Sequence, residues 1–544
     1  MAGATESTSE ILREETTGTG IVAAGAVLLS TVLFALGLAA LFELISITDP
    51  LIGLPTISIL GLLLTILGVA VIVFGIGSSL GVITTDPRMN AGLVATIAFS
   101  AIWFVVGGLI GSQTLGLPLV GWLLVAFVCG GLAFAVTVLP REDIGSTLPA
   151  GLLAVLVGGA FLTGVIGPGW AWEPARLRAT FVAEFTVPVL TLFSALLAGW
   201  AAAKAYGGFG ARGRHLGAYV LVYLNAVSIV SVLFVLVAFT LIKGLPGLIQ
   251  GITIGVGVGP ETTINLLGFS HTIVWPISWP FVMNGVALLN DYNGVLPAIV
   301  GTFWLVVGAV VFAVPLGVGS AIFLTEYAER GRFTQIVEIA TNGLWSTPSI
   351  VFGLFGFAFL VPRFGGRKSL LSGMLTLGFM LLPLVIITSR EAMLSVPDEY
   401  RDASAALGVS KWKTIRSVVL PAALPGVVTG IILGVGRIAG ETAPILLTMA
   451  GGTFVPGSQT VDVIGGFEFI ATPPFVTNPE LLQATSALPY QLFALITAGV
   501  GLSDNVGSPD EFKWAAALVL LLVVLSFYAV GIVTRYYFRR KLRQ

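Results

Sequence analysis

The chain has 544 residues, of which 56% are hydrophobic and only 10% charged, with a net charge of −1. Its mean hydropathy is +1.01 and its pI about 6.2. A soluble domain needs about 25% charged residues to cover its surface, so the composition predicts an integral membrane protein and gives no reason to expect a nucleic-acid partner. The single cysteine, Cys129, excludes a disulfide within the chain. The polar, acidic residues 1–19 are unlike the basic start of a signal peptide.

Long apolar runs follow one another along the chain. A bilayer core of about 30 Å is crossed by about 20 apolar residues in a helix, and the backbone of such a segment finds hydrogen-bond partners only within the helix. About twelve runs meet this length: 20–45, 57–84, 91–112, 117–139, 149–167, 186–204, 216–243, 298–324, 335–361, 370–388, 422–450 and 513–536. We therefore expect an all-α membrane protein. Small residues four apart, such as Gly107 and Gly111 or Gly430 and Gly434, permit close helix contacts.

Basic residues indicate the orientation of these spans. The C-terminal stretch "RYYFRRKLRQ" is rich in Arg and Lys, which favours the cytoplasmic side. Counting back through the spans places segments 205–215 and 389–421 and the N-terminus inside, and the long loops 244–297 and 451–512 outside. The stretch "PRFGGRK" (362–368) is an exception, because the count places its basic residues outside.

The chain divides near residue 210. We expect a polar cytoplasmic N-terminus (1–19), a membrane region of about six helices (20–205) and a second membrane domain (216–544). The first region has almost no ionisable residue within a span, whereas the second carries long outer loops, a charged span and a large cytoplasmic segment. No repeat relates the two halves, which speaks against an inverted-repeat secondary transporter.

The cytoplasmic segment "EYRDASAALGVSKWKTIRSVVLP" (399–421) is polar and helix-prone. Its first part is rich in alanine, a strong helix former, and Gly408 is suited to end that helix in a left-handed conformation. Ser410 is a good start for a second helix, and Pro421 for the following membrane helix. The sequence therefore predicts a rigid elbow of two short helices between two membrane spans. An ordinary amphipathic connector on the membrane surface is the alternative.

This segment resembles the "EAA" loop of ABC-importer permeases. The residues that carry the resemblance are Asp402, Ala403, Ser404, Gly408, Leu420 and Pro421. Asp402 replaces the usual Glu and Ser404 the usual Ala, and both keep the charge or size. In that family the loop seats in a groove of a cytoplasmic ATPase, so the resemblance implies an ATPase-coupling role for these six residues.

From about residue 216 onward the chain resembles PstA-type permease subunits of phosphate ABC importers. The motifs are 294–328, "STPSIVFGLFG" (346–356), the EAA segment and "GRIAGETAPILLTMAGG" (436–452). The resemblance implies a type I permease core in the last six helices, a homologous second permease, two ATPase subunits and an extracytoplasmic phosphate-binding protein. It implies a transport subunit and not an enzyme, without a cofactor of its own: the chain lacks a P-loop motif, so ATP and Mg would be bound by the partner ATPase.

Arg437 and Glu441 lie within the 422–450 run. A charge at the bilayer centre costs about 2.5–3.5 kcal/mol, and the i, i+4 spacing predicts that the two residues pair on one helix face. A purely structural pair is one interpretation. The other is a substrate pathway, since Arg offers bidentate donors to an oxyanion, and the family resemblance places a pathway arginine and glutamate at this motif.

Four further residues belong to the predicted pathway or its surroundings. Thr442 and Thr448 would add hydroxyl contacts, unless they bond to the preceding helical turn, and Pro444 is expected to kink the helix. Arg390 lies at the cytoplasmic end of the 370–388 span, where it either contributes to the pathway or extends to the interface.

The expected function is that of a permease subunit for ATP-driven phosphate import in the cell membrane. Two alternatives stay open: the same role for another oxyanion, molybdate or sulfate, and a self-contained ion-coupled secondary transporter. The aromatic outer segment 260–282, with Trp275 and Trp279, is either an anchor in the membrane interface or a landing surface for the external binding protein.

Overall fold

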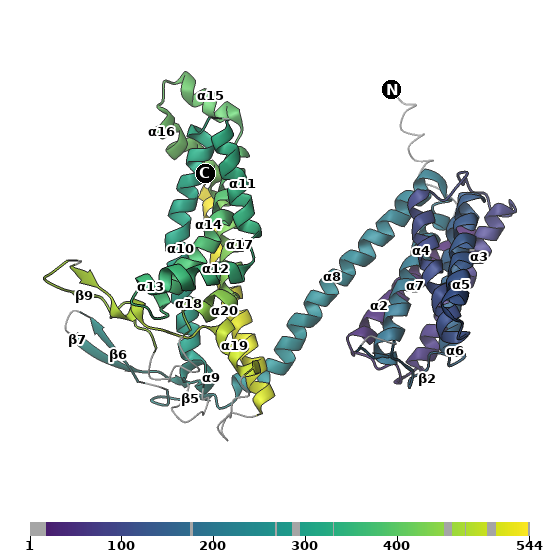
Figure 1. Cartoon of the computed structure of the whole chain (residues 1–544), viewed down its shortest axis with the longest axis horizontal. Coiled ribbons are helices and arrows are strands. Elements are labelled where there is room, and N and C mark those ends of the chain that lie inside the picture. The colour runs from purple at the N-terminus through teal and green to yellow at the C-terminus, as the bar shows by residue number, and fades with distance from the viewer. Residues whose placement is uncertain are drawn as a thin grey trace, which may run out of the picture. The chain divides into compact units, whose positions relative to one another are not determined.

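The computed structural model describes residues 18–174, 178–259, 261–266, 269–285, 294–329, 331–450, 460–473, 475–497 and 508–541. In these residues the protein is largely helical, with a few two-stranded hairpins (Figure 1). Eleven of the described helices are long and apolar enough to cross a membrane, and one bent pair of helices brings the number to twelve. The prediction of an all-α membrane protein with about twelve spans is confirmed.

Contacts divide the chain into two compact units, Met1–Leu236 and Val237–Gln544. The boundary falls inside one long helix, α8 (Gly210–Ile249), which therefore belongs to both units. The expected domains 20–205 and 216–544 stay a prediction, because a boundary within a continuous helix does not define where one domain ends.

The first unit is a bundle of membrane helices. α3 packs along α6, α4 along α5, and α2 along α7. Leu60, Leu64 and Leu67 of α3 are fully buried and form the centre of its core. The elements are α2 Gly18–Leu41, β1 Pro50–Leu51, β2 Leu54–Pro55, α3 Thr56–Ser79, α4 Leu93–Leu109, the π-helix η1 Ile110–Thr114, α5 Leu119–Val138, α6 Glu142–Leu162, β3 Ala171–Trp172, β4 Phe181–Val182 and α7 Ala183–Tyr206.

Glycines determine how closely α3 and α6 approach. Gly61 and Gly68 of α3 face Gly158 and Gly151 of α6, and the spacing of seven residues keeps both pairs on one seam. A Cβ atom on Gly158 would lie 2.6 Å from the carbonyl oxygen of Gly61, and one on Gly151 would lie 2.7 Å from that of Gly68. Lipid gives helices no hydrophobic reason to associate, so close backbone packing of this kind stabilises the pair.

The predicted close contact at Gly107 and Gly111 is also present. A Cβ atom on Gly107 would lie 2.7 Å from Cβ of Cys129, and one on Gly111 would lie 3.0 Å from Cα of Trp122. Cys129 itself is a free, partly buried cysteine, which packs against α4 and so behaves as a small hydrophobic residue.

One end of the first unit contains a buried ion pair. Nζ of Lys204, in the last turn of α7, lies 2.8 Å from Oε1 of Glu142, in the first turn of α6, and both side chains are at most 1% exposed. Lys204 also donates to Oγ of Ser146 (2.7 Å), and Oε2 of Glu142 accepts from the backbone N–H groups of Arg88 (3.3 Å) and Gly210 (3.2 Å). The expectation that the first spans carry almost no charge is wrong here, because α6 begins at Glu142, seven residues before the predicted run.

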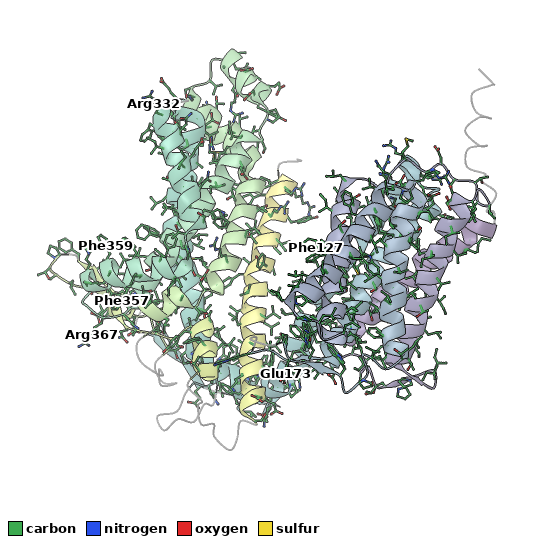
Figure 2. All side chains as sticks on the ribbon, turned by 45° about the vertical axis from the view of Figure 1, so that its right-hand side comes forward. Phe127, Glu173, Arg332, Phe357, Phe359 and Arg367 are labelled. Atoms are coloured by element: carbon green, nitrogen blue, oxygen red, sulfur yellow. The ribbon has the colours of Figure 1, made fainter. Side chains whose placement is uncertain are left out.

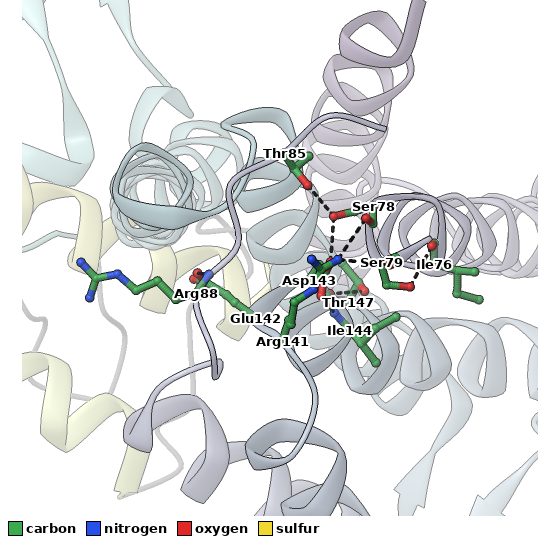
Figure 3. A network of polar contacts seen from close by, with 10 residues as sticks. All are labelled: Ile76, Ser78, Ser79, Thr85, Arg88, Arg141, Glu142, Asp143, Ile144 and Thr147. Carbon is green, nitrogen blue, oxygen red and sulfur yellow. Dashed lines mark hydrogen bonds and ion pairs between the residues drawn. The ribbon is translucent and has the colours of Figure 1, made fainter. Parts of the chain in front are cut away.

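A second carboxylate extends this network (Figure 3). Asp143 is fully buried and accepts from Oγ of Ser78 at 2.9 Å and from Nη2 of Arg141 at 3.0 Å. Ser78 in turn is 2.6 Å from Oγ1 of Thr85. The network connects α3, α6, α7 and the loop between α3 and α4. Buried charges of this kind are tolerated because each is paired and hydrogen-bonded.

The second unit contains the predicted elbow. It also contains two broken helices where the sequence predicts continuous spans. α10 packs along α14, α14 along α17, and α17 along α20, around a core that includes the buried residues Leu305, Leu377 and Leu381. Besides α8, the elements are β5 Thr253–Ile254, β6 Glu261–Leu266, β7 Phe269–Val274, β8 Ile277–Ser278, α9 Pro280–Met283, α10 Leu296–Ile322, the π-helix η2 Phe323–Tyr327, α11 Arg332–Ser346, α12 Ser349–Phe355, the π-helix η3 Gly356–Leu360, α13 Val361–Arg363, α14 Leu370–Leu394, α15 Asp398–Ala406, α16 Lys411–Thr414, the π-helix η4 Ile415–Val419, α17 Leu420–Ala439, α18 Ala443–Thr448, β9 Glu468–Phe469, β10 Val476–Thr477, the 3₁₀-helix η5 Pro479–Leu482, α19 Leu488–Thr497 and α20 Pro509–Lys541.

The elbow and the hairpins occupy opposite ends of the second unit. Helices α15 and α16 project at one end, whereas strands β5, β6, β7 and β9 lie at the other (Figure 1). Arg332, at the start of α11, lies toward the elbow end (Figure 2). In the aromatic segment 260–282, Nε1 of Trp279 donates to the carbonyl of Leu248 at 2.6 Å, so Trp279 holds the end of α8, and Trp275 is 46% exposed.

Small residues also bring α14 and α17 together. A Cβ atom on Gly426 would lie 2.7 Å from Cβ of Ala392, and Cβ atoms on Gly430 and Gly434 would overlap the side chains of Thr388 and Leu381. The predicted close contact at Gly430 and Gly434 is therefore present.

Two of the predicted continuous spans are broken. The run 335–361 forms α11 and a second segment, Ser349–Arg363, bent from it by 101°. The break falls at Thr347 and Pro348, because proline lacks an N–H and disfavours a helical conformation in the residue before it. The run 422–450 forms α17, which ends at Ala439, and α18. Pro444 lies in the first turn of α18 and so starts a helix where a kink was expected.

Two adjacent glycines of α6 provide a matched test of the α3–α6 seam. Gly158→Ala places a methyl group against Gly61, and we expect it to destabilise the protein by about 1–3 kcal/mol through overpacking. Gly159 has no atom within 4 Å of its added Cβ, so Gly159→Ala should be neutral or stabilising by up to about 1 kcal/mol through helix propensity. Thermal unfolding of the purified protein measures both. Equal melting temperatures of the two variants would contradict the close backbone contact between α3 and α6.

Candidate functional site

The elbow consists of two helices at an angle, as the sequence predicts. The first, α15, ends at Ala406, and Gly408 follows with φ of +69°. The N–H of Gly408 donates to the carbonyl of Ala405 at 2.9 Å, and that of Val409 to Ser404 at 3.1 Å. These are the two bonds of a Schellman motif, which needs a residue that adopts the left-handed conformation without a steric penalty. Gly408 therefore defines the bend.

The second arm is continuous with the membrane helix. α16 begins after Ser410, whose hydroxyl makes no capping bond, and the π-helix η4 connects it to α17. α17 begins at Leu420 with Pro421 in its first turn, as predicted. Residues Lys411–Ala439 together form one apolar helical span. A displacement of the elbow is therefore passed to α17 without an intervening loop.

The six EAA-like residues differ in exposure. Asp402, Ala403 and Gly408 are exposed, whereas Leu420 and Pro421 are half-buried. Ser404 is buried, and its hydroxyl donates to the carbonyl of Tyr400 at 3.0 Å. Large apolar side chains accompany the exposed residues: Tyr400, Leu407 and Trp412 are 54%, 82% and 56% exposed. The elbow thus presents exposed apolar side chains together with charges of both signs, since Lys411, Lys413 and Arg416 are also exposed.

Arg401 attaches the elbow to the membrane helices. Its Nη2 lies 2.9 Å from Oε1 of Glu326 in η2, and Nε lies 3.3 Å from the same oxygen. Nη2 also donates to the carbonyl of Met393, and Nη1 to the carbonyl of Val396 and to Oδ1 of Asp398. Glu326 is only 8% exposed, so its charge depends on this pairing. One guanidinium therefore joins the ends of α10, α14 and α15.

This attachment is not among the features that the sequence predicts. Glu326 was available as a signal, because it is the only charged residue of α10 and η2 in an otherwise apolar run. A lone carboxylate at the end of a span needs a partner, and Arg401 lies 75 positions away in the sequence. Only the fold brings the two together.

Arg437 lies in the last turn of α17, beside the middle of the neighbouring helix α14. Gly434, three residues earlier, meets Leu381 of α14, close to the midpoint of that helix. Cζ of Arg437 lies 4.3 Å from the ring centre of Trp345, the penultimate residue of α11. The cation therefore lies where two broken helices, α11–α12 and α17–α18, come close to one another.

The predicted pairing of Arg437 with Glu441 is wrong. α17 ends at Ala439, so Glu441 lies outside the helix and the i, i+4 geometry does not apply. Among the described residues no carboxylate oxygen lies within 4.0 Å of Arg437. Glu441 and Thr442 are half-buried in the break before α18. Thr448 is fully buried, and its hydroxyl bonds the carbonyl of Pro444 one turn earlier at 2.7 Å, which is the alternative that the sequence left open.

Arg390 pairs with an acidic residue that the sequence analysis did not single out. Its Nη2 lies 2.5 Å from Oε1 of Glu338 in α11, and the two side chains are 32% and 36% exposed. Nε of Arg390 is buried and has no hydrogen-bond partner in the described part of the chain. Arg390 and Arg437 are thus brought to the same helix, α11, from α14 and α17.

A cavity of about 370 Å³ adjoins this region. It is lined by residues of α11, α12 and α14 that are mostly apolar: Thr341, Leu344, Thr347, Val351, Phe352, Phe355, Phe379, Leu382, Pro383 and Ile386. Neither arginine lines this cavity, but each guanidinium offers positive charge and hydrogen-bond donors to an anion.

Comparison with known proteins gives concordant results. Residues 313–544 match the family described as binding-protein-dependent transport system inner membrane component. The chain is 33% identical over 265 residues to phosphate transport system permease protein PstA 1 of Mycobacterium tuberculosis, covering 49% of this chain and 77% of that protein. It is 31% identical over 255 residues to PstA of Haemophilus influenzae, covering 46% and 78%. With the probable ABC transporter permease protein YqgI of Bacillus subtilis it shares 33% over 208 residues, covering 38% and 69%.

Among solved structures, the chain resembles the MetNI methionine ABC transporter in inward-facing conformations. The TM-score is 0.32 at 17% identity, covering 45% of this chain and 94% of that one. A bacterial ABC transporter involved in alginate import gives a TM-score of 0.31 at 14% identity, covering 44% and 79%.

The attachment of the elbow is testable through Arg401→Met, which keeps the length of the side chain and removes its charge. Loss of the charged hydrogen bonds should lower the free energy of local opening by about 2 kcal/mol. Hydrogen exchange of the amides in α15 should then accelerate about thirtyfold. Arg416→Met serves as the control, because Arg416 is exposed in η4. Unchanged exchange in the Arg401 variant would rule out the attachment.

Proposed function

Because the chain belongs to the PstA family of ABC-importer permeases, we propose that it is the subunit through which inorganic phosphate crosses the membrane. The observation that carries this proposal is the position of Arg437 at the end of α17, beside the middle of α14. Its guanidinium lies against an indole ring and has no carboxylate partner among the described residues. An unpaired charge at that depth is costly, and an oxyanion would supply the missing partner.

Phosphate would pass along the face where α11, α14 and α17 meet. Arg437 would bind it through two parallel N–H donors, and Glu441 and Thr442 lie in the adjoining helix break. Arg390 of α14, which pairs with Glu338 in the middle of α11, would be a second contact point. Broken helices are compatible with this role, since irregular backbone at membrane depth is tolerated where it lines a polar route.

The 399–421 elbow would transmit the motion of a cytoplasmic ATPase. Its exposed residues Asp402, Leu407 and Trp412 would form the docking surface, and the buried Ser404 and the bend at Gly408 would keep its shape. Two rigid connections support this role. Arg401 joins α15 to Glu326 at the end of α10, and α16 continues without a break into α17.

The proposed assembly contains this chain, a homologous second permease, two cytoplasmic ATPase subunits, an external phosphate-binding protein and membrane lipid, without nucleic acid. ATP and Mg would be bound by the ATPases, so the chain itself would carry no cofactor. The elbow end and both termini would face the cytoplasm. This orientation agrees with the basic residues Arg535, Arg539, Arg540 and Lys541 at the end of α20. Residues 216–544 would form the permease domain and residues 20–205 an added membrane region.

Substitution of Arg437 tests the pathway. We expect Arg437→Ala to reduce uptake of labelled phosphate at least tenfold while the complex still co-purifies, because a single charged donor pair is worth about 1.5–3 kcal/mol. Arg363→Ala is a matched control: Arg363 is also stacked on an aromatic ring, that of Phe359 at 3.6 Å, but is exposed on α13. Normal uptake by the Arg437 variant would refute the pathway.

Substitution of Leu407 tests the docking surface. Leu407→Asp places a charge in the most exposed apolar position of the elbow, and we expect it to abolish co-purification of the ATPase and ATP-dependent uptake. Leu407→Met keeps an apolar side chain of similar size and should retain both. Uptake that survives depletion of ATP would instead favour an ion-coupled transporter, and stronger inhibition of transport by molybdate or sulfate than by phosphate would favour another oxyanion.

A further inference from the structure

One face of α11 contacts both pathway arginines. Glu338, Thr341 and Trp345 are spaced i, i+3 and i+7 and therefore lie on the same side of the helix. Glu338 pairs with Arg390 of α14, and Trp345 contacts Arg437 of α17. Thr341, between them, lines the 370 Å³ cavity. Seven residues of α-helix separate the two contacts by about 10 Å along the axis.

The two arginines are held in chemically different ways. Nη2 of Arg390 is 2.5 Å from a carboxylate oxygen, so an anion that binds this edge of the guanidinium competes with Glu338. Among the described residues, no hydrogen bond or ion pair of Arg437 accompanies its contact with the ring of Trp345. A cation–π contact does not hydrogen-bond the five N–H donors of the guanidinium to a polar group. These donors are therefore available to an anion while the contact persists.

We propose that α11 determines how readily an anion can bind each of the two arginines, and that Trp345 and Glu338 are its positioning residues. Trp345 keeps Arg437 open by holding the guanidinium without hydrogen-bonding its N–H donors, which stay free for a tetrahedral oxyanion. Glu338 keeps Arg390 closed by neutralising it. An anion then binds first at Arg437 and reaches Arg390 only by displacing Glu338. This inference rests on the proposed function.

The arrangement accounts for two requirements of a transport site. Binding must be strong enough for the anion to enter the membrane and weak enough for it to leave. The indole ring supports the cation at Arg437 without supplying a competing negative charge, since its π face is only weakly polar compared with a carboxylate. At Arg390 the carboxylate competes with the anion and prevents a second strong site from trapping it. Trp345 is 37% exposed, so the stacked pair remains accessible.

Phosphate binding to the assembled complex in lipid nanodiscs, with the external binding protein omitted, tests the role of Trp345. Trp345→Leu removes the π face and should raise the Kd for phosphate about three- to thirtyfold, the range of one cation–π contact. Trp345→Phe retains an aromatic face and should stay within about threefold of the wild type. Thermal unfolding of each complex verifies that the variants are folded.

Glu338→Gln tests the other half of the proposal and should have an opposite signature. Without the carboxylate, Arg390 becomes available, so the Kd for phosphate should fall while turnover at saturating phosphate also falls, because release slows. A purely structural ion pair would instead weaken binding and turnover together, or change neither. Either of those results would overturn the role of Glu338.

The outcomes separate this inference from the proposed function. If Arg437→Ala abolishes phosphate binding but Trp345→Leu binds as the wild type does, the positioning role is wrong and the pathway stands. The positioning role is also wrong if Trp345→Phe is as impaired as Trp345→Leu, since only the size of the side chain would then matter. If Arg437→Ala binds phosphate normally, the proposed function itself fails.

Discussion

A charged group inside a membrane must find its partner within the protein, and the organisation of the second unit follows from how three arginines meet this constraint. Arg401 bonds a buried carboxylate and two backbone carbonyls. Arg390 pairs with one partly exposed carboxylate. Arg437 has the face of an indole ring. Among the described residues, the number of hydrogen bonds and ion pairs decreases from Arg401 to Arg390 and from Arg390 to Arg437.

The same constraint explains why the broken helices lie where they do. A helix that ends within a membrane leaves backbone groups without intrahelical partners. The ends of α11 and α17 are close to each other at the contact of Trp345 with Arg437, so the protein concentrates its irregular backbone in one region. Elsewhere α14 and α17 are held in close contact by glycines. A rigid pair of helices next to a locally broken region is a suitable frame for a binding site that must change its shape.

The first unit resolves its buried charges differently. At one end of the bundle Glu142 pairs with Lys204 and accepts from the backbone of Gly210, and Asp143 accepts from Ser78 and Arg141. The glycine seam between α3 and α6 then fixes the helices along their length. Paired and hydrogen-bonded charges of this kind contribute rigidity to the end of the bundle. Among the described residues, Glu142, Asp143 and Lys204 are all paired or hydrogen-bonded, whereas Arg437 has no carboxylate partner.

The sequence by itself determined the membrane class, the approximate positions of the spans, the elbow with its bend at Gly408 and the family resemblance. Each of these depends on local properties: apolar run length, helix propensity and short motifs with fixed spacing. Only the tertiary structure decided the partners of the charged residues. Glu326 and Arg401 are 75 positions apart, and the break at Gly440 separates Arg437 from Glu441 although their spacing suits a helix. Pairing across a membrane protein depends on which helices are neighbours, and no local pattern in a single chain encodes that neighbourhood.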